Sequence, residues 1–317
     1  GMVAIMTEFH HISVLLEESI DALRVTPGGI YADGTLGGGG HSALICERMQ
    51  GKGMLIGIDQ DSTAIAAASE RLLAYGSMIK IVKNNFSNIK AIMQELNVTE
   101  LDGAVLDLGV SSPQLDDGER GFSYHTDARL DMRMNRDAVF SAYELVNTYE
   151  EERIADIIFR YGEERYARRI AKEIVTARED KPLTTTFELV ECIKRAIPAG
   201  ARFADKHPAK RTFQAIRIAV NDELDILDGA LRDFTDLLKS GGRLAVITFH
   251  SLEDRIVKNT FSDLATGCVC PKEFPVCVCG NTPKVRVVTR KPIVADDRAL
   301  EQNYRAHSAK LRVIEKI

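Results

Sequence analysis

The most constraining feature of this chain is a short apolar segment that runs into a series of glycines. Residues 29–32 (Gly-Ile-Tyr-Ala) are typical of a buried strand, Asp33 follows, and residues 37–40 are four consecutive glycines. A helical pattern begins at His41. A strand, a glycine loop and a helix in this order bring the backbone close to a ligand and point a helix N-terminus at it. The segment therefore predicts a binding loop for a cofactor that contains adenosine.

An alternation of strands and helices continues after this loop. Apolar, strand-like runs occur at residues 53–58, 79–82 and 103–108, and helical patterns separate them. This order predicts an α/β fold with a mostly parallel sheet and right-handed crossovers. In such sheets, ligands bind at the carboxyl ends of the strands.

Three side chains follow these strands at the same edge of the predicted sheet as Gly39 of the loop. Asp59 is suited to accept hydrogen bonds from ribose hydroxyls, because the alternative role, capping of the next helix, fits Asp61 or Ser62 better. Phe86 could pack on an adenine ring, and a place in the core fits it almost as well. Asp107 ends the fourth strand. The agreement of these positions favours a single cofactor site.

The loop departs from two common nucleotide-binding motifs. The G-x-G-x-x-G fingerprint fails because Ser42 stands at its last position when the motif is counted from Gly37, and no Gly-Lys-Ser/Thr follows as in a phosphate-binding P-loop. Asp33, next to the loop, would repel a pyrophosphate but attract a cation. S-adenosylmethionine carries an ammonium and a sulfonium group, so the loop predicts this cofactor rather than NAD.

The fourth strand is followed by Ser111-Ser112-Pro113-Gln114, where amino-methyltransferases carry an Asp/Asn/Ser-Pro-Pro-aromatic motif. The exocyclic amine of a base is a poor nucleophile, because its lone pair is delocalised into the ring. A polar side chain and a backbone carbonyl that accept its N–H bonds would raise its electron density and aim it at a methyl group. Ser111, Ser112 and Pro113 are therefore candidate catalytic residues, and the alternative is an ordinary Ser-Pro turn.

A long insertion interrupts the alternation. The next core strand lies at residues 243–248, whereas one crossover needs only a dozen or more residues. Helical patterns in this interval predict an inserted α-helical domain at 121–212, between two parts of the α/β core at 1–120 and 213–317. Two further segments alternate like the antiparallel strands that close such a sheet, at 285–289 and 311–314.

The strand at 243–248 is followed by a histidine and a capping signal. Ser251 and Asp254 form a capping box, which predicts that Ser251 caps a helix at 252–261. His250 precedes them at the ligand-binding edge of the sheet. Contact with the substrate and a structural hydrogen bond fit His250 equally well.

Charge is distributed unevenly along the chain. The net charge of −5 argues weakly against a nucleic-acid partner, but residues 160–217 hold 14 Lys/Arg and 8 Asp/Glu, and residues 284–316 hold 9 and 4. A basic middle and a basic tail on an acidic body are typical of a protein that binds a polyanion. Solvated helix faces are the alternative explanation.

The composition is that of a soluble globular protein. The 317 residues are 45% hydrophobic, and no run approaches the ~18 consecutive apolar residues of a membrane span. The first residues lack the pattern of a signal peptide, and six cysteines in a chain of this length are not a disulfide framework. We therefore expect a cytoplasmic protein with no membrane partner.

Four of the cysteines form two C-x-C pairs, Cys268 with Cys270 and Cys277 with Cys279. Four thiolates suit tetrahedral zinc, but C-x-C is tighter than the usual C-x2-C spacing. Free thiols on a surface loop are the favoured alternative, and the sequence predicts no metal in the catalytic site.

Longer motifs make the chain resemble a known family, the bacterial small-subunit (16S) ribosomal RNA cytosine-N4-methyltransferases of the methyltransferase H, MraW-like type, which modify a decoding-centre cytidine. The resemblance spans nearly the whole chain. The stretches that carry it are 11–18 (HISVLLEE), 33–42, 107–117, 118–124 (GERGFSY), 130–134 (LDMRM), 147–149, 161–164, 210–217 (KRTFQAIR), 249–255 and 303–312.

The resemblance implies a class I, Rossmann-like methyltransferase core with a mostly parallel seven-stranded sheet, S-adenosylmethionine as cofactor, and an inserted all-α domain that contacts RNA. The cofactor positions of the family correspond here to Gly39, Gly40, His41, Asp59, Phe86, Asp107 and Gln114. Gln114 stands where the wider amino-methyltransferase group has an aromatic residue. Stacking of the target base must then come from elsewhere, with Phe122 and Tyr124 as candidates.

The partner that the resemblance implies is ribosomal RNA. An insertion of this size predicts recognition of the assembled small ribosomal subunit, and a homodimer is left open. Two alternatives keep the same cofactor core. One is a DNA cytosine-N4 or adenine-N6 amino-methyltransferase, and the other is a non-catalytic ribosome-assembly factor.

Overall fold

The computed structural model describes residues 14–202, 207–302 and 304–317. The chain divides into two compact units: one comprises residues up to Gly109 together with Leu224–Ile317, and the other comprises Val110–Glu223. Of the family motifs, residues 11–13 and Asn303 lie outside the described residues. Among the described helices, none is long and apolar enough to cross a bilayer.

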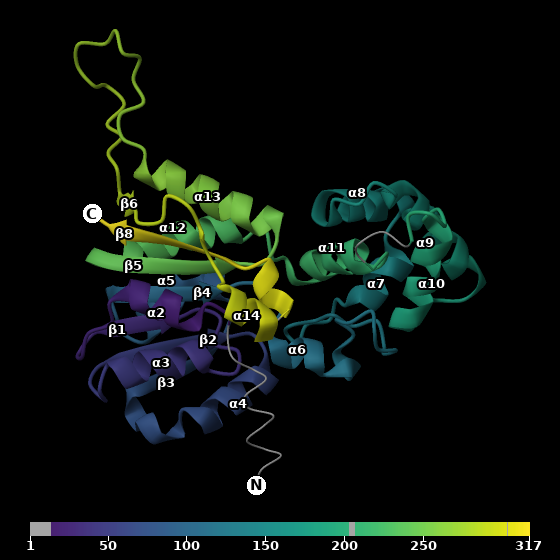
Figure 1. The fold of residues 1–317 in the computed structure, drawn as a ribbon, viewed down its shortest axis with the longest axis horizontal. Coiled ribbons are helices and arrows are strands. Elements are labelled where there is room, and N and C mark those ends of the chain that lie inside the picture. The colour runs from purple at the N-terminus through teal and green to yellow at the C-terminus, as the bar shows by residue number, and fades with distance from the viewer. Residues whose placement is uncertain (1–13, 203–206, 303) are drawn as a thin grey trace. The chain divides into compact units, whose positions relative to one another are not determined.

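The first unit is built on one sheet with the strand order β3-β2-β1-β4-β5-β8-β6, and β7 pairs with β8 (Figure 1). Strands β1 to β5 are parallel, whereas β8 is antiparallel to β5, β6 and β7. The predicted α/β fold with a mostly parallel sheet is confirmed, and the two-residue strand β7 is an addition to the predicted seven. The strands are β1 (Ile30–Asp33), β2 (Met54–Asp59), β3 (Ile79–Lys83), β4 (Leu101–Asp107), β5 (Leu238–Thr248), β6 (Val285–Val287), β7 (Ile293–Val294) and β8 (Lys310–Lys316).

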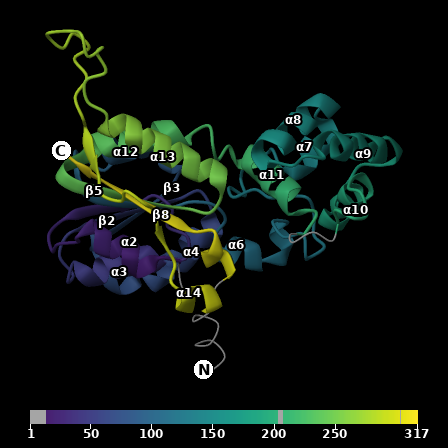
Figure 2. The same cartoon turned by 45° about the horizontal axis from the view of Figure 1, so that its top comes forward.

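Helices cover both faces of this sheet. Figure 2 shows α12 (Leu227–Leu237) and α13 (Ser251–Ala265) on one face, and α2 (Leu16–Leu23) and α3 (Gly40–Arg48) on the other. The remaining elements of the unit are α4 (Ser62–Arg71), α5 (Ile89–Glu95), α14 (Asp297–Gln302) and the short 3-10 helices η1 (Leu73–Met78), η2 (Phe86–Asn88) and η4 (Tyr304–His307).

The central strands are largely apolar because both of their faces are covered. In β2, Leu55, Ile56 and Ile58 are completely buried. Ile56 and Ile58 belong to the same core cluster as Phe234 of α12, whereas Leu55 belongs to the cluster of Ile45 of α3. Burial contributes roughly 25 cal/mol per Å² of apolar surface to the free energy of folding. The same burial fixes the register in which the carboxyl ends of β1, β2 and β4 meet.

The second unit is helical, and its elements are α6 (Ser112–Asp116), η3 (Gly118–Arg120), α7 (Ala142–Thr148), α8 (Glu151–Gly162), α9 (Ala167–Asp180), α10 (Thr186–Ala196) and α11 (Lys210–Asn221). The unit encloses the predicted insertion at 121–212 and extends beyond it at both ends. The sequence assigns residues 213–226 to the α/β core, but Phe213 and Ile216 of α11 pack into the core of the helical unit. An apolar periodicity identifies the buried face of a helix and leaves its packing partner undefined.

One ion pair in the first unit predicts a stability that depends on pH. Arg312 of β8 donates two hydrogen bonds to Asp254 of α13, at 2.8 and 2.9 Å, and both residues are buried. Burial alone would raise the pKa of Asp254, but the hydrogen bonds and charge of Arg312 hold this pKa below its ordinary value. The pair therefore stabilises the fold above the unfolded pKa of about 4, and this contribution is lost as the pH falls through the lower folded value.

We expect Arg312→Met to reduce the free energy of unfolding at pH 7 by about 3 kcal/mol, because it leaves a buried carboxylate without its main partner. Urea unfolding from pH 3 to pH 7 measures this effect, and the difference between the variant and the original protein should shrink at the acidic end. The double variant Arg312→Met/Asp254→Leu should recover much of the loss. An equal loss at all pH values would contradict the assignment.

Candidate functional site

The glycine loop joins β1 to α3 and is shaped by two left-handed glycines. Gly37 has φ +51°, and Gly39, the N-cap residue of α3, has φ +86°. These conformations are rarely open to residues with a Cβ atom. A Cβ at Gly39 would also lie 3.4 Å from Cβ of Ala68. No side chain in the described part of the chain caps α3 at Gly39. The first backbone N–H groups of this helix are therefore not used by a side-chain cap.

Asp33 organises this loop from inside. Its carboxylate accepts hydrogen bonds from the backbone N–H of Thr35 at 3.1 Å and from the hydroxyl of Ser42 at 2.7 Å. The hydroxyl of Thr35 in turn accepts the backbone N–H of Asp107 at 2.7 Å. Burial raises the pKa of Asp33 to about 6. The sequence predicts that Asp33 faces a cationic ligand, but the structure uses its carboxylate to tie β1, α3 and the end of β4 together.

Asp59, at the end of β2, fixes the other side of the loop. Its two carboxylate oxygens accept the backbone N–H groups of Gly37 at 2.8 Å and of Asp61 at 2.9 Å. Burial is the main reason that the pKa of Asp59 is raised. The N-cap of α4 is Asp61, which accepts the N–H of Thr63 at 3.0 Å. Capping therefore does not occupy Asp59, and its carboxylate retains acceptor capacity for a ligand hydroxyl.

His41 and Asp107 lie next to each other at this edge. Nδ1 of His41 is 3.9 Å from a carboxylate oxygen of Asp107. His41 is 4% exposed, and burial lowers its pKa to about 4, so the imidazole is neutral at pH 7. Its Nε2 atom is buried and has no hydrogen-bond partner among the described residues. A buried polar atom of this kind is costly unless a ligand or water satisfies it.

Phe86 begins η2, directly after β3, and is half-buried. Its Cβ lies close to Gly34, where an added Cβ would be 3.1 Å away, and its ring packs against the core cluster of Ile56 and Phe234. Phe86 therefore has a packing role, and its partial exposure leaves surface for contact with a flat ring.

These groups fit S-adenosylmethionine. The loop with Gly39 and Gly40, the acceptor oxygens of Asp59, the half-buried ring of Phe86 and the unsatisfied Nε2 of His41 belong to consecutive strand ends of one sheet. The fit consists of a glycine-lined backbone, a carboxylate beside it and a buried polar atom that no group in the described part of the chain satisfies. The strand pattern predicted that Asp59 and Phe86 lie at this edge with Gly39, and the resemblance to the family added Gly40 and His41. Neither pointed to Thr35 and Ser42, which hold the loop.

The predicted catalytic residues begin the helical unit. Ser111 caps α6: its hydroxyl accepts the N–H of Gln114 at 3.4 Å, and the side-chain oxygen of Gln114 accepts the N–H of Ser111 at 3.1 Å. Pro113 lies in the first turn of α6 and is exposed, whereas Gln114 is 5% exposed. Ser112 is the first residue of α6. The sequence offered a turn as the alternative, and the observed structure is a capping box.

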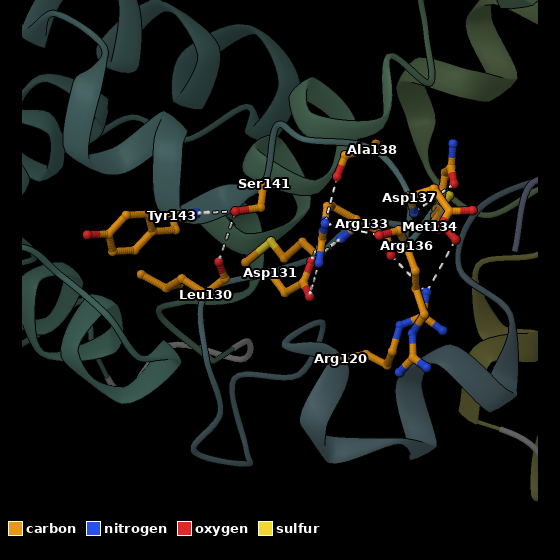
Figure 3. A network of polar contacts seen from close by, with 12 residues as sticks. Arg120, Leu130, Asp131, Arg133, Met134, Arg136, Asp137, Ala138, Ser141 and Tyr143 are labelled. Carbon is orange, nitrogen blue, oxygen red and sulfur yellow. Dashed lines mark hydrogen bonds and ion pairs between the residues drawn. The ribbon is translucent and has the colours of Figure 1, made fainter. Parts of the chain in front are cut away.

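A network of polar contacts holds residues 130–134, which follow α6 and η3 in the chain. Figure 3 shows Arg133 contacting Asp131 and the carbonyl of Ala138, with the Nε–Oδ1 distance to Asp131 at 2.6 Å. Arg120 is buried and donates to the carbonyl of Arg133 at 2.8 Å. The hydrogen bonds and charge of Arg133 outweigh burial and hold the pKa of Asp131 below its ordinary value. The motif 130–134 therefore works as a rigid loop of the helical unit.

The two aromatic candidates differ in exposure. Phe122 is 7% exposed, packs in the core of the helical unit and has the Arg120 guanidinium 5.7 Å from its ring centre. Its ring is therefore not available to stack on a base. Tyr124 is half-buried and stacks on His207, with ring centres 4.5 Å apart. His125 lies 4.5 Å from Tyr124 and is exposed, so these rings form an aromatic group at the surface of the unit.

Exposed arginines lie over tyrosines near the ends of α8 and α9. Arg153 lies 3.9 Å from the ring centre of Tyr149. Arg165 and Arg169 lie 5.0 and 5.8 Å from the ring centre of Tyr166. Guanidinium groups and aromatic rings in contact are the side chains that bind phosphates and unstacked bases.

The sheet order of the first unit, with one antiparallel strand between β5 and β6, defines a class I methyltransferase fold. The model of the MraW methylase family matches residues 8–317, and the chain belongs to this family. Membership of a methylase family with this fold and site makes S-adenosylmethionine the cofactor.

Three relatives illustrate the similarity, and each bears the name ribosomal RNA small subunit methyltransferase H. The one from Brevibacillus brevis is 56% identical over 309 residues, which cover 98% of both chains. The one from Fusobacterium nucleatum subsp. nucleatum is 56% identical over 97% of both chains. The one from Clostridioides difficile is 53% identical over 98% of this chain and 100% of its own.

Proposed function

We propose that this protein transfers a methyl group from S-adenosylmethionine to the N4 amine of a decoding-centre cytidine in small-subunit (16S) ribosomal RNA. Methylation of small-subunit ribosomal RNA is the activity that the family and the names of the relatives support. The observation that carries the proposal is a cofactor-binding strand edge followed, four residues after Asp107, by the Ser-Ser-Pro-Gln segment.

We assign the cofactor to the strand ends of the first unit. Asp59 accepts the two ribose hydroxyls, and Phe86 packs on the adenine ring. The backbone at Gly39 and Gly40 passes close to the cofactor, and the neutral imidazole of His41 supplies a polar contact through Nε2. Asp107 completes the set in the first unit, and the resemblance to the family adds Gln114, which belongs to α6 of the second unit.

The cofactor supplies an electrophilic methyl group when it is bound. The segment Ser111-Ser112-Pro113 orients the N4 amine toward that methyl group. A polar side chain and a backbone carbonyl of this segment accept the N–H bonds of the amine. N4 would gain the methyl group, and the electron pair of the carbon–sulfur bond that held it would remain on the sulfur of the cofactor. The extra proton on N4 then leaves to water, so a general base is not required. Catalysis consists mainly of proximity and orientation.

The RNA is assigned to the helical unit. Arg165 and Arg169 would contact phosphates, and Tyr124 with His125 would stack on the target base after it leaves its neighbours. A large RNA-binding unit is useful when the target is presented within a folded particle. We therefore propose the assembled small ribosomal subunit as the substrate.

Methyl transfer from tritiated cofactor, followed by nucleoside mass spectrometry, tests this function. Assembled small subunits from cells that lack the enzyme should acquire one N4-methylcytidine, and naked RNA should react poorly. Label in DNA in place of RNA would favour a DNA amino-methyltransferase. Cofactor binding without any transfer would favour a non-catalytic assembly factor. Equal methylation of naked oligonucleotides and subunits would overturn the recognition of the assembled particle.

A further inference from the structure

The loop between α13 and β6 brings four cysteines together at one point. The Sγ atoms of Cys268, Cys270, Cys277 and Cys279 all lie within 4.8 Å of one another. The loop projects from the sheet of the first unit in both ribbon views (Figures 1 and 2). No step of the proposed methyl transfer uses these thiols.

The distances match a metal site better than a pair of disulfides. The Sγ–Sγ distances are 4.0 Å for Cys270 and Cys277, 3.4 Å for Cys277 and Cys279, and 3.8 Å for Cys279 and Cys268. Neighbouring sulfurs of a tetrahedral site with Zn–S bonds of about 2.3 Å are ~3.8 Å apart. A disulfide would need about 2.05 Å.

The C-x-C spacing is compatible with this arrangement. In an extended segment, residues i and i+2 lie on the same side, so each pair can present two sulfurs to one point. The intervening residues Val269 and Val278 are 63% and 74% exposed, as expected if they point away from that point. The short C-x-C spacing disfavours zinc when only the sequence is considered. In the structure, the chain turns back between the two pairs and brings all four sulfurs to one point.

Backbone amides support the sulfurs. The N–H of Val278 lies 3.3 Å from Sγ of Cys270, and the N–H of Asn281 lies 3.5 Å from Sγ of Cys279. Hydrogen bonds to sulfur stabilise the thiolate form, which is the form that binds metal.

Apart from its base, where Asn281 donates to the carbonyls of Thr266 and Gly267, the loop has little else to hold it. All side chains from Pro271 to Lys284 are exposed, and they include Phe274 and Val276. A segment without a core of its own needs a covalent or metal staple to keep one conformation. We propose that the four cysteines bind one structural zinc ion that fixes this loop.

Metal analysis of the full-length protein, purified under reducing conditions with zinc in the medium, tests the site. We expect about one zinc per chain. Cys268→Ser/Cys277→Ser, which removes one sulfur from each pair, should lose this zinc. Val269→Thr/Val278→Thr, in the same loop, should keep it. Iron in place of zinc, or zinc retained by the cysteine variant, would overturn the proposal.

Two further measurements remain informative if the cysteine variant misfolds. Co²⁺ exchanged into the original protein should give the intense visible bands of a tetrahedral thiolate site. Chelation should make four thiols reactive and open the loop to protease, while the sheet stays folded. Four thiols that react equally fast with and without bound zinc would rule out the site. Neither measurement depends on methyl-transfer activity, so failure of the zinc site and failure of the proposed function are distinguishable.

Discussion

Asp59→Ala is expected to weaken the binding of S-adenosylmethionine by about 100-fold. The variant removes the acceptor for two ribose hydroxyls, and charge-assisted hydrogen bonds to a carboxylate together contribute about 3 kcal/mol in such a site. It also releases the N–H of Gly37, which Asp59 holds at 2.8 Å, so the glycine loop loses one of its supports. Isothermal titration calorimetry with the intact protein measures the effect.

Asp61→Asn is the matched control for this prediction. Asp61 lies two residues away and caps α4, and asparagine caps a helix as well as aspartate does. The control should therefore bind the cofactor normally. Thermal unfolding of both variants distinguishes a missing ligand acceptor from a destabilised fold. Unchanged cofactor affinity in folded Asp59→Ala would remove Asp59 from the site.

Arg165→Glu/Arg169→Glu is expected to reduce the affinity for small-subunit RNA on the order of 100-fold at low salt. Both arginines lie over Tyr166, exposed to solvent, and reversal of their charge replaces attraction to phosphates by repulsion. The dependence of log Kd on log salt should also fall, by about 0.7 for each phosphate that the variant no longer binds. Filter binding at several salt concentrations measures both effects.

The control for this pair carries the same change in charge on the first unit. Lys52 and Lys258 are exposed, and Lys52→Glu/Lys258→Glu should alter RNA affinity much less. The arginine variant should keep its affinity for S-adenosylmethionine, because its substitutions lie in the helical unit. If the two charge-reversed variants lose RNA affinity equally, the effect is one of net charge, and Arg165 and Arg169 do not bind the RNA.

The strand ends of the first unit could be predicted because two independent signals coincide there. Apolar runs mark β1, β2 and β4, and a polar residue at the end of each run marks the edge where parallel strands meet. Asp59 and Asp107 were placed at this edge in this way, and they do end β2 and β4. Residues that act through a hydroxyl alone, such as Thr35 and Ser42, have no such signal, since threonine and serine occur in every kind of loop.

Helix caps were harder to predict, because a cap depends on which side chain reaches the first free N–H group. The sequence favours Ser251 as the cap of α13, but the structure uses His250, whose Nδ1 lies 3.3 Å from the N–H of Glu253. That contact also supports the structural alternative for His250. Met132 shows a second limit: it is fully buried with φ +62°, a conformation that nothing in its residue type predicts.

The pairing of β4 with β5 joins segments that are synthesised far apart in time. Residues 108–237 lie between these strands, and the whole helical unit is made in that interval. Helical contacts are local and form quickly, whereas long-range parallel pairing is slow. During synthesis on the ribosome, β4 therefore remains an unpaired sheet edge until β5 is made, and this edge can pair with other chains. The insertion lengthens the aggregation-prone stage of synthesis, and hydrogen exchange during refolding should show protection in α8 and α9 before β4.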